Sequence, residues 1–235
     1  MKLTKKLSLV FALILIGAVT YSQNCNFYIP LQENKGAVYK NFDANGVLQG
    51  SQEMKILEVA KHSEHIEATI SSKQFDSNER LIHQGDFSVK CADNKIVIDI
   101  TSILDPSMMD GFEDMEIRME TDDIVIPTDL SVGQKLPDAR VNMKVSTAGM
   151  IITDLTFTLK ERKVLSKEEV NVPAGSFEAY KIVYNFIIET KAMGMDSKLE
   201  FKNIEYHSAD IGMVKSETYD QTDEIISYTV LNKIL

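Results

Sequence analysis

Two features of this 235-residue sequence predict an all-β fold. About a dozen short segments are rich in β-branched and aromatic residues, and turn-forming residues separate them at intervals of roughly 8–12 residues. Neither an internal repeat nor a low-complexity linker interrupts this pattern. We therefore expect a curved antiparallel sheet or an open barrel-like fold with one short helix.

The N-terminal half is predicted to contribute six of these strands. They cover residues 36–42, 47–59, 66–75, 81–89, 95–100 and 123–126. The dipeptide Asn45-Gly46 is typical of a tight hairpin and joins the first two. Pro127 has no backbone donor, so it marks the sixth segment as an edge strand or a strand end.

The C-terminal half is predicted to contribute the remaining strands. They cover residues 139–145, 151–159, 164–172, 179–190, 198–207, 213–219 and 225–231. Apolar and polar side chains alternate over the first of these segments, which is typical of a half-buried strand. We expect turns at 173–175 and around Gly194, and Gly212 should adopt a backbone conformation that other residues resist.

One helix is expected between the two halves, near residues 105–112. Asp105 can cap it, and Pro106 suits its first helical position. The residues after it, from Met115 to Glu120, alternate apolar and polar side chains, so a strand should follow the helix.

The first 22 residues are typical of a signal peptide. Lysines precede an apolar run from Leu7 to Val19, and Ser22 offers the small residue that a signal peptidase needs. The run is too short to span a bilayer of about 30 Å, and charges interrupt most predicted strands, so we expect no integral membrane insertion. Residues 23–235 should then form a single β-rich domain, periplasmic or extracellular after cleavage.

The two cysteines, Cys25 and Cys91, are expected to form a disulfide, because export places them in an oxidising compartment. The bridge would contribute on the order of 4 kcal/mol in the chain-entropy model. A lipid anchor on Cys25 is disfavoured, because Ser22, Gln23 and Asn24 before it do not match a lipobox.

The charged residues argue against a nucleic-acid partner and give no support to a calcium site. The formal net charge of −10 disfavours nucleic acid, whose phosphates would be repelled. Acidic residues crowd the segment 105–123, but their spacing matches no calcium loop, so we interpret them as a solvated face. His62 and His65 should point to opposite faces of a strand, an argument that weakens if they lie in a turn. We predict no metal and no cofactor.

Methionine is abundant and admits three interpretations: core filling, a flexible apolar cavity, or copper binding. Core filling is the simplest of the three. If the chain holds an apolar ligand, the Met-rich stretch should line its cavity. The residues that we predict for this role are Met108, Met109, Phe112, Met115 and Met119.

Catalysis has little support in the sequence. It contains neither a Gly-x-Ser-x-Gly nucleophile elbow nor a phosphate-binding glycine loop, and both cysteines are expected to be oxidised. We therefore assign no catalytic residues and predict that the protein is not an enzyme.

Four short motifs resemble a family of exported β-rich domains of unknown function that is common in Bacteroidetes-type bacteria. They cover residues 28–31, 132–138, 172–182 and 212–217, and their order along the chain is the better evidence. The resemblance implies an antiparallel β fold in the periplasm or outside the cell, and it brings no catalytic residues with it.

These observations lead to one functional hypothesis and one alternative. The first is a non-enzymatic envelope protein that binds a lipid or another hydrophobic small molecule between a curved sheet and a covering helix. The alternative is a structural module with a fully packed core that interacts with another envelope protein. A continuous apolar cavity would favour the first hypothesis.

Overall fold

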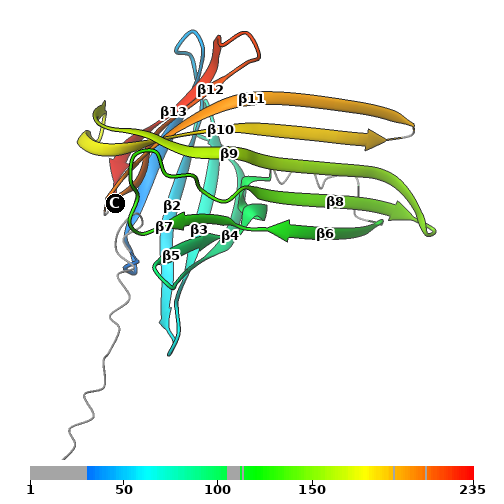
Figure 1. Ribbon diagram of the computed structural model, residues 1–235, viewed down its shortest axis with the longest axis horizontal. Coiled ribbons are helices and arrows are strands. Elements are labelled where there is room, and N and C mark those ends of the chain that lie inside the picture. The colour runs from blue at the N-terminus through cyan, green and yellow to red at the C-terminus, as the bar shows by residue number, and fades with distance from the viewer. Residues whose placement is uncertain (1–30, 105–111, 113, 193, 210) are drawn as a thin grey trace, which may run out of the picture.

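The protein is almost entirely built of β-strands, as Figure 1 shows. The computed structural model describes residues 31–104, 112, 114–192, 194–209 and 211–235. The first seven strands are β1 (Gly36–Asp43), β2 (Leu48–Lys61), β3 (Ile66–Asp76), β4 (Leu81–Ala92), β5 (Lys95–Ile98), β6 (Glu116–Asp122) and β7 (Ile124–Pro127). The remaining six are β8 (Ala139–Thr147), β9 (Met150–Val172), β10 (Gly175–Ala192), β11 (Met195–Ser208), β12 (Gly212–Tyr219) and β13 (Ile225–Ile234).

All of these strands belong to one antiparallel sheet in the order β6-β8-β9-β10-β11-β12-β13-β1-β2-β3-β4-β5-β7. The strands at the two ends of this order, β6 and β7, are separated in sequence only by Asp123, and β7 also contacts β8. The ends of the sheet therefore meet, and the sheet forms a nearly closed barrel. In Figure 1 the long strands β8–β11 run steeply across β2–β4, which shows how strongly the sheet is twisted.

Several local predictions are confirmed. A turn at Asn45-Gly46 joins β1 to β2, and β7 with Pro127 is an edge strand. Gly212 has a φ of +94°, a conformation that favours glycine. The all-β, curved antiparallel fold that these signals predicted is the fold observed.

The prediction of separate strands at 151–159 and 164–172 is wrong. The chain runs through both segments as the single strand β9, with a bulge where Glu161 and Arg162 together lie opposite Tyr184 of β10. Glu161 has a φ of +59°, and its backbone N–H donates to Asp138 Oδ1 at 2.9 Å. A bulge of this kind bends a strand and changes which side chains face inward.

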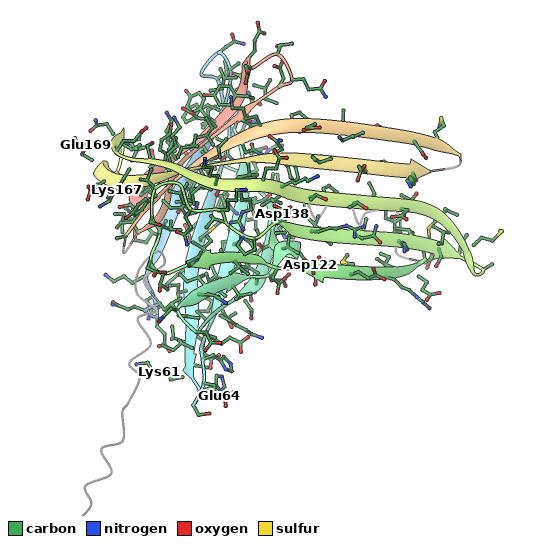
Figure 2. The ribbon with its side chains drawn as sticks, viewed as in Figure 1. Lys61, Glu64, Asp122, Asp138, Lys167 and Glu169 are labelled. Carbon is green, nitrogen blue, oxygen red and sulfur yellow. The ribbon has the colours of Figure 1, made fainter. Side chains whose placement is uncertain are left out.

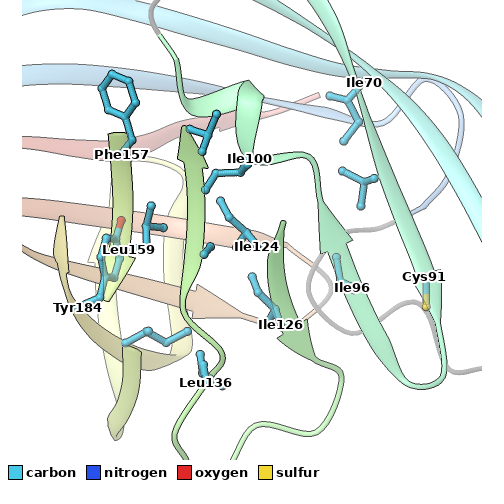
Figure 3. Close-up of a cluster of buried hydrophobic side chains, with 14 of the residues drawn as sticks. Ile70, Cys91, Ile96, Ile100, Ile124, Ile126, Leu136, Phe157, Leu159 and Tyr184 are labelled. Atoms are coloured by element: carbon cyan, nitrogen blue, oxygen red, sulfur yellow. The ribbon is translucent and has the colours of Figure 1, made fainter. Parts of the chain in front are cut away.

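The main core fills the inside of the sheet with aliphatic side chains from most of the strands. Figure 3 shows part of it, with Leu159 and Tyr184 on neighbouring strands near Ile124 and Ile126 of β7. A second cluster, which includes Val170, Tyr206 and Leu231, packs where the β9–β10 hairpin meets β13. Burial on this scale is the main favourable term in folding.

Two further predictions concern the expected helix and the expected disulfide. The helix expected near 105–112 lies almost entirely outside the described residues; a 3-10 helix η1 (Ile100–Ile103), capped by Asp99, comes just before it. Cys91 is fully buried at the end of β4, but Cys25 lies outside the described residues, so their disulfide stays a prediction. Within the described residues, no helix has the length and apolar character needed to cross a membrane.

Candidate functional site

The inside of the barrel contains a cavity of about 450 Å³. Its wall is mostly apolar and is formed by strands from many parts of the sheet. Aliphatic and aromatic residues of β2–β5 and β7 supply much of it: Met54, Ile56, Ile70, Phe87, Val89, Ile96, Ile98, Ile124 and Ile126. The volume lies within the range of roughly 300–1,000 Å³ that is usual for small-molecule pockets.

A few polar side chains interrupt the apolar wall at Arg162 of β9 and at Glu205 and His207 of β11. Glu205 and His207 are two residues apart on one strand, so both point to the same face, whereas Ile204 and Tyr206 between and beside them belong to the second core cluster. The candidate site is this polar group together with the apolar cavity that it borders.

The β9 bulge is what turns Arg162 inward. Before the bulge the buried apolar residues of β9 have odd numbers, as in Phe157 and Leu159; after it the buried residues Arg162 and Val164 have even numbers. Because side chains alternate along a strand, one extra residue exchanges the two faces. Without the bulge, a strand continuing from Leu159 would direct Arg162 outward.

Arg162 is deeply buried, with 3% of its surface exposed. Its Nη1 donates to the carbonyl oxygens of Val125 at 3.1 Å and Pro137 at 2.9 Å. Its Nε has no hydrogen-bond partner, and among the described residues no carboxylate lies within ion-pair distance of its guanidinium. The carbonyl dipoles offset the buried guanidinium charge only in part. Burying an incompletely compensated charge costs free energy, because the charge loses its hydration.

Glu205 is the centre of a short hydrogen-bonded network. Tyr184 Oη donates to Glu205 Oε1 at 2.6 Å, and His207 Nε2 lies 2.8 Å from Glu205 Oε2. Both carboxylate oxygens are therefore engaged by residues of β10 and β11. The network fixes the Glu205 side chain at the cavity wall.

The network also controls protonation. Burial alone would raise the pKa of the Glu205 carboxyl, but the hydrogen bonds from His207 and Tyr184 and the charges of His207 and Arg162 hold that pKa below its ordinary value. Burial and the neighbouring Glu205 charge raise the pKa of Tyr184 well above its ordinary value, so its hydroxyl remains a donor. Burial lowers the pKa of Arg162, while the charge of Glu205 opposes that change.

The charges around the cavity contrast with those of the whole chain. Three basic side chains border it, Lys35, Lys55 and Arg162, against the single carboxylate of Glu205. The full sequence, by comparison, has a formal net charge of −10. A positive balance at an apolar cavity in an acidic protein favours an anionic group on a bound molecule.

Three of the five predicted cavity residues belong to the described part of the chain, and they lie away from this cavity. Met108 and Met109 are outside the described residues, Phe112 and Met115 pack against the main core, and Met119 on β6 is 37% exposed. None of the last three borders the cavity, so the ligand-binding role predicted for this stretch stays a prediction. The methionines that do border the cavity are Met54 of β2 and Met213 of β12.

Sequence reasoning missed all of the polar residues of this site. Glu205 and His207 had one usable signal, because two ionisable residues at i and i+2 on a strand share a face. The change from odd to even buried positions between Leu159 and Val164 could similarly have located the bulge. No local pattern, however, could have predicted that Arg162 and Glu205 border the same cavity, since they lie on strands that are not adjacent.

Two solved structures have a fold similar to that of this chain. A Bacteroides fragilis protein, named as exported and as having a YmcC-like fold, aligns with a TM-score of 0.69 at 19% identity, over 90% of this chain and 100% of that one. A Parabacteroides distasonis protein named as a lipoprotein aligns with a TM-score of 0.73 at 22% identity, over 91% and 100%. The DUF3108-like family model matches residues 32–231. No curated protein matches the chain.

Proposed function

We propose that this chain, which belongs to the DUF3108-like family, is a non-enzymatic binding protein of the bacterial envelope. It would hold a hydrophobic ligand inside its barrel. The observation that carries the proposal is the apolar cavity of about 450 Å³. Protein interiors are normally packed as densely as organic crystals, with few voids larger than a water molecule. An apolar cavity of this size exposes apolar surface to water unless a hydrophobic molecule fills it.

The polar side chains at the cavity narrow the ligand class to an amphipathic, anionic molecule such as a fatty acid or another acidic lipid. The apolar wall would receive the hydrocarbon part, while the incompletely compensated Arg162 would attract a carboxylate or phosphate group. Lys35 and Lys55 add to that attraction. The hydrogen bonds that the Glu205 carboxylate makes with Tyr184 and His207 partly offset its negative charge at the cavity wall.

An envelope location is supported by the predicted signal peptide and by two similar structures, named as an exported protein and as a lipoprotein. The alternative of a structural or protein-interaction module required a fully packed core, and the cavity argues against that packing. An enzyme would need a nucleophile or an acid–base pair free to act. Both oxygens of Glu205 are instead engaged, and among the described residues no serine or threonine hydroxyl bonds to His207.

Native mass spectrometry of the protein, purified from the periplasm without detergent, tests the proposal directly. We expect an added mass that disappears after organic extraction. The extracted protein should then bind a dansyl-labelled fatty acid saturably. A spectrum with the mature mass alone, together with no saturable binding of the probe, would overturn the proposal.

A cavity-filling pair of variants locates the binding. Ile98→Trp places a large ring in the cavity wall and should weaken probe binding about tenfold or more, because it removes space that the hydrocarbon needs. Ile152→Trp is the matched control, since Ile152 is also half-buried against the main core but does not border the cavity. Equal loss in both variants would mean that binding depends on general stability rather than on this cavity.

A further inference from the structure

The turn between β2 and β3 brings together a second cluster of ionisable side chains, remote from the cavity. His62 and His65 occupy the two ends of this turn, and the backbone N–H of His62 donates to the carbonyl of His65 at 2.9 Å. Their rings stack, with centroids 4.4 Å apart. The expectation that these two side chains point to opposite faces is therefore wrong, because it assumed a strand and the residues lie in a turn.

Glu67 joins the two histidines because it lies two residues after His65 and so shares its face at the start of β3. One ligand atom from each of the three side chains lies within 4.8 Å of the others. His65 Nε2 and Glu67 Oε2 are 3.9 Å apart. In Figure 2 the labelled Lys61 and Glu64 mark this hairpin tip, which projects away from the body of the barrel.

The Glu67 carboxylate is already oriented for a further partner. Its Oε1 accepts a hydrogen bond from Ser88 Oγ at 3.1 Å and lies 3.7 Å from Lys90 Nζ. Its Oε2 is the oxygen that faces His65. Outer partners of this kind commonly hold a metal-ligating carboxylate in place and leave its second oxygen for the ion.

From this geometry we propose that His62, His65 and Glu67 form a binding site for a divalent transition-metal ion of the zinc class. Two imidazoles and one carboxylate are a common ligand set for zinc, with water completing the coordination. Ligand atoms around a tetrahedral zinc ion lie about 3.4 Å apart, given bonds of about 2.0–2.2 Å. Their ligand atoms lie within 4.8 Å of one another, so each pair needs to approach by at most about 1.4 Å, which ring rotation in a half-exposed turn can supply.

The proposed ion would connect the two strands of the hairpin at its free end. His62 follows β2, whereas Glu67 belongs to β3, so coordination links both strands across the turn. Binding should slow the opening of the hairpin and raise the melting temperature, roughly with the logarithm of the zinc concentration once that concentration exceeds Kd.

Calorimetric titration of tag-free, chelator-treated protein with zinc chloride tests this proposal. We expect one saturable zinc ion per chain, and a loss of affinity of about tenfold or more in both His62→Ala and His65→Ala. His83→Ala is the matched control, because His83 lies toward the opposite end of β4, paired with Gln74, and should bind zinc as the wild type does.

A second measurement separates a site from general surface binding. Zinc should protect the backbone amides of residues 61–67 from hydrogen exchange in the wild type and in His83→Ala, but not in His65→Ala. The proposal is overturned if no saturable heat is observed, or if zinc binds equally well to the His62→Ala and His65→Ala variants. These outcomes are independent of the cavity, because circular dichroism and fatty-acid binding should be unchanged in all three variants.

Discussion

The two faces of the β8–β11 part of the sheet hold polar side chains in opposite ways. The inner face presents the group around Arg162 and Glu205 to an apolar cavity. The outer face has a smaller pocket of about 200 Å³ that is almost wholly polar, lined by Glu120, Arg140, Asn142, Lys144, Asp154, Thr156, Glu189 and Lys191. The strand β9 contributes to both, so the two environments differ only by which way its side chains point.

The difference shows that burial determines how much a charged side chain contributes to stability. Six of the outer residues are ionisable, yet among the described residues none of them forms an ion pair within 4.0 Å. Solvent screens such groups, and their pairs are worth little. The inner residues cannot rely on water, so each must be satisfied by a fixed partner or by a ligand. We therefore expect equivalent substitutions to have large effects inside and small effects outside.

The largest expected effect is that of Glu205→Ala. This change removes the acceptor of Tyr184 and His207 and takes away the carboxylate charge nearest to the buried Arg162. It should lower the free energy of unfolding by about 2–4 kcal/mol, measured by urea denaturation. Glu189→Ala, in the exposed outer pocket, is the matched control and should stay within about 0.5 kcal/mol of the wild type. Equal effects would contradict the comparison.

Acid should reproduce part of the same loss without a mutation. The pKa of Glu205 is held below its ordinary value of 4.5 in the folded protein, so the unfolded chain binds this proton more readily. The resulting stabilisation is therefore fully present above the ordinary value and is lost as pH falls through the lower, folded-state pKa. Urea denaturation at pH values from neutral to below 4.5 should show a steeper fall for the wild type than for Glu205→Gln. Parallel curves would contradict this assignment.

Local signals in the sequence were sufficient for most of the fold. The hairpin at Asn45-Gly46 and the edge strand before Pro127 each depend on the backbone chemistry of one or two residues, which context seldom overrides. The continuity of β9 was missed because the four consecutive charged residues 160–163 resemble a loop. In the structure, three of those side chains are exposed, and only Arg162 enters the interior.

The candidate site was less predictable because its parts come from distant strands. The composition of the Met-rich stretch near residue 115 suits a cavity, and its ligand-binding role stays a prediction. Which side chains line the cavity described here depends on strand register, which brings Met54 of β2 and Met213 of β12 to its wall, on strands separated by β13 and β1. A single sequence contains no signal for that register until the order of the strands is known.

Asn142 gives an intermediate case, since it belongs to the outer pocket but is only 5% exposed. Its Nδ2 donates to Asp154 Oδ1 at 2.5 Å and to Thr156 Oγ1 at 2.8 Å. Asn142→Ala should lower the free energy of unfolding by about 1–2 kcal/mol, because it leaves these acceptors without their donor. Asn171→Ala, at an exposed position of β9, is the control and should have almost no effect. If both variants behave alike, the outer face is uniformly solvent-screened despite the burial of Asn142.

The smallest effect concerns the bulge that assigns Arg162 to the inner face. Glu161 adopts a left-handed conformation with a φ of +59°, which costs an ordinary residue about 1 kcal/mol, whereas glycine adopts it freely. Glu161→Gly should therefore raise the free energy of unfolding by a few tenths to about 1 kcal/mol and leave fatty-acid binding intact. Lys160→Gly, one residue earlier in regular strand conformation, should lower it by about 0.5–1 kcal/mol. Opposite signs at adjacent positions would identify the bulge as a built-in feature of the native strand. A loss of stability in both variants would instead mean that the Glu161 side chain, and not its backbone conformation, holds Arg162 toward the cavity.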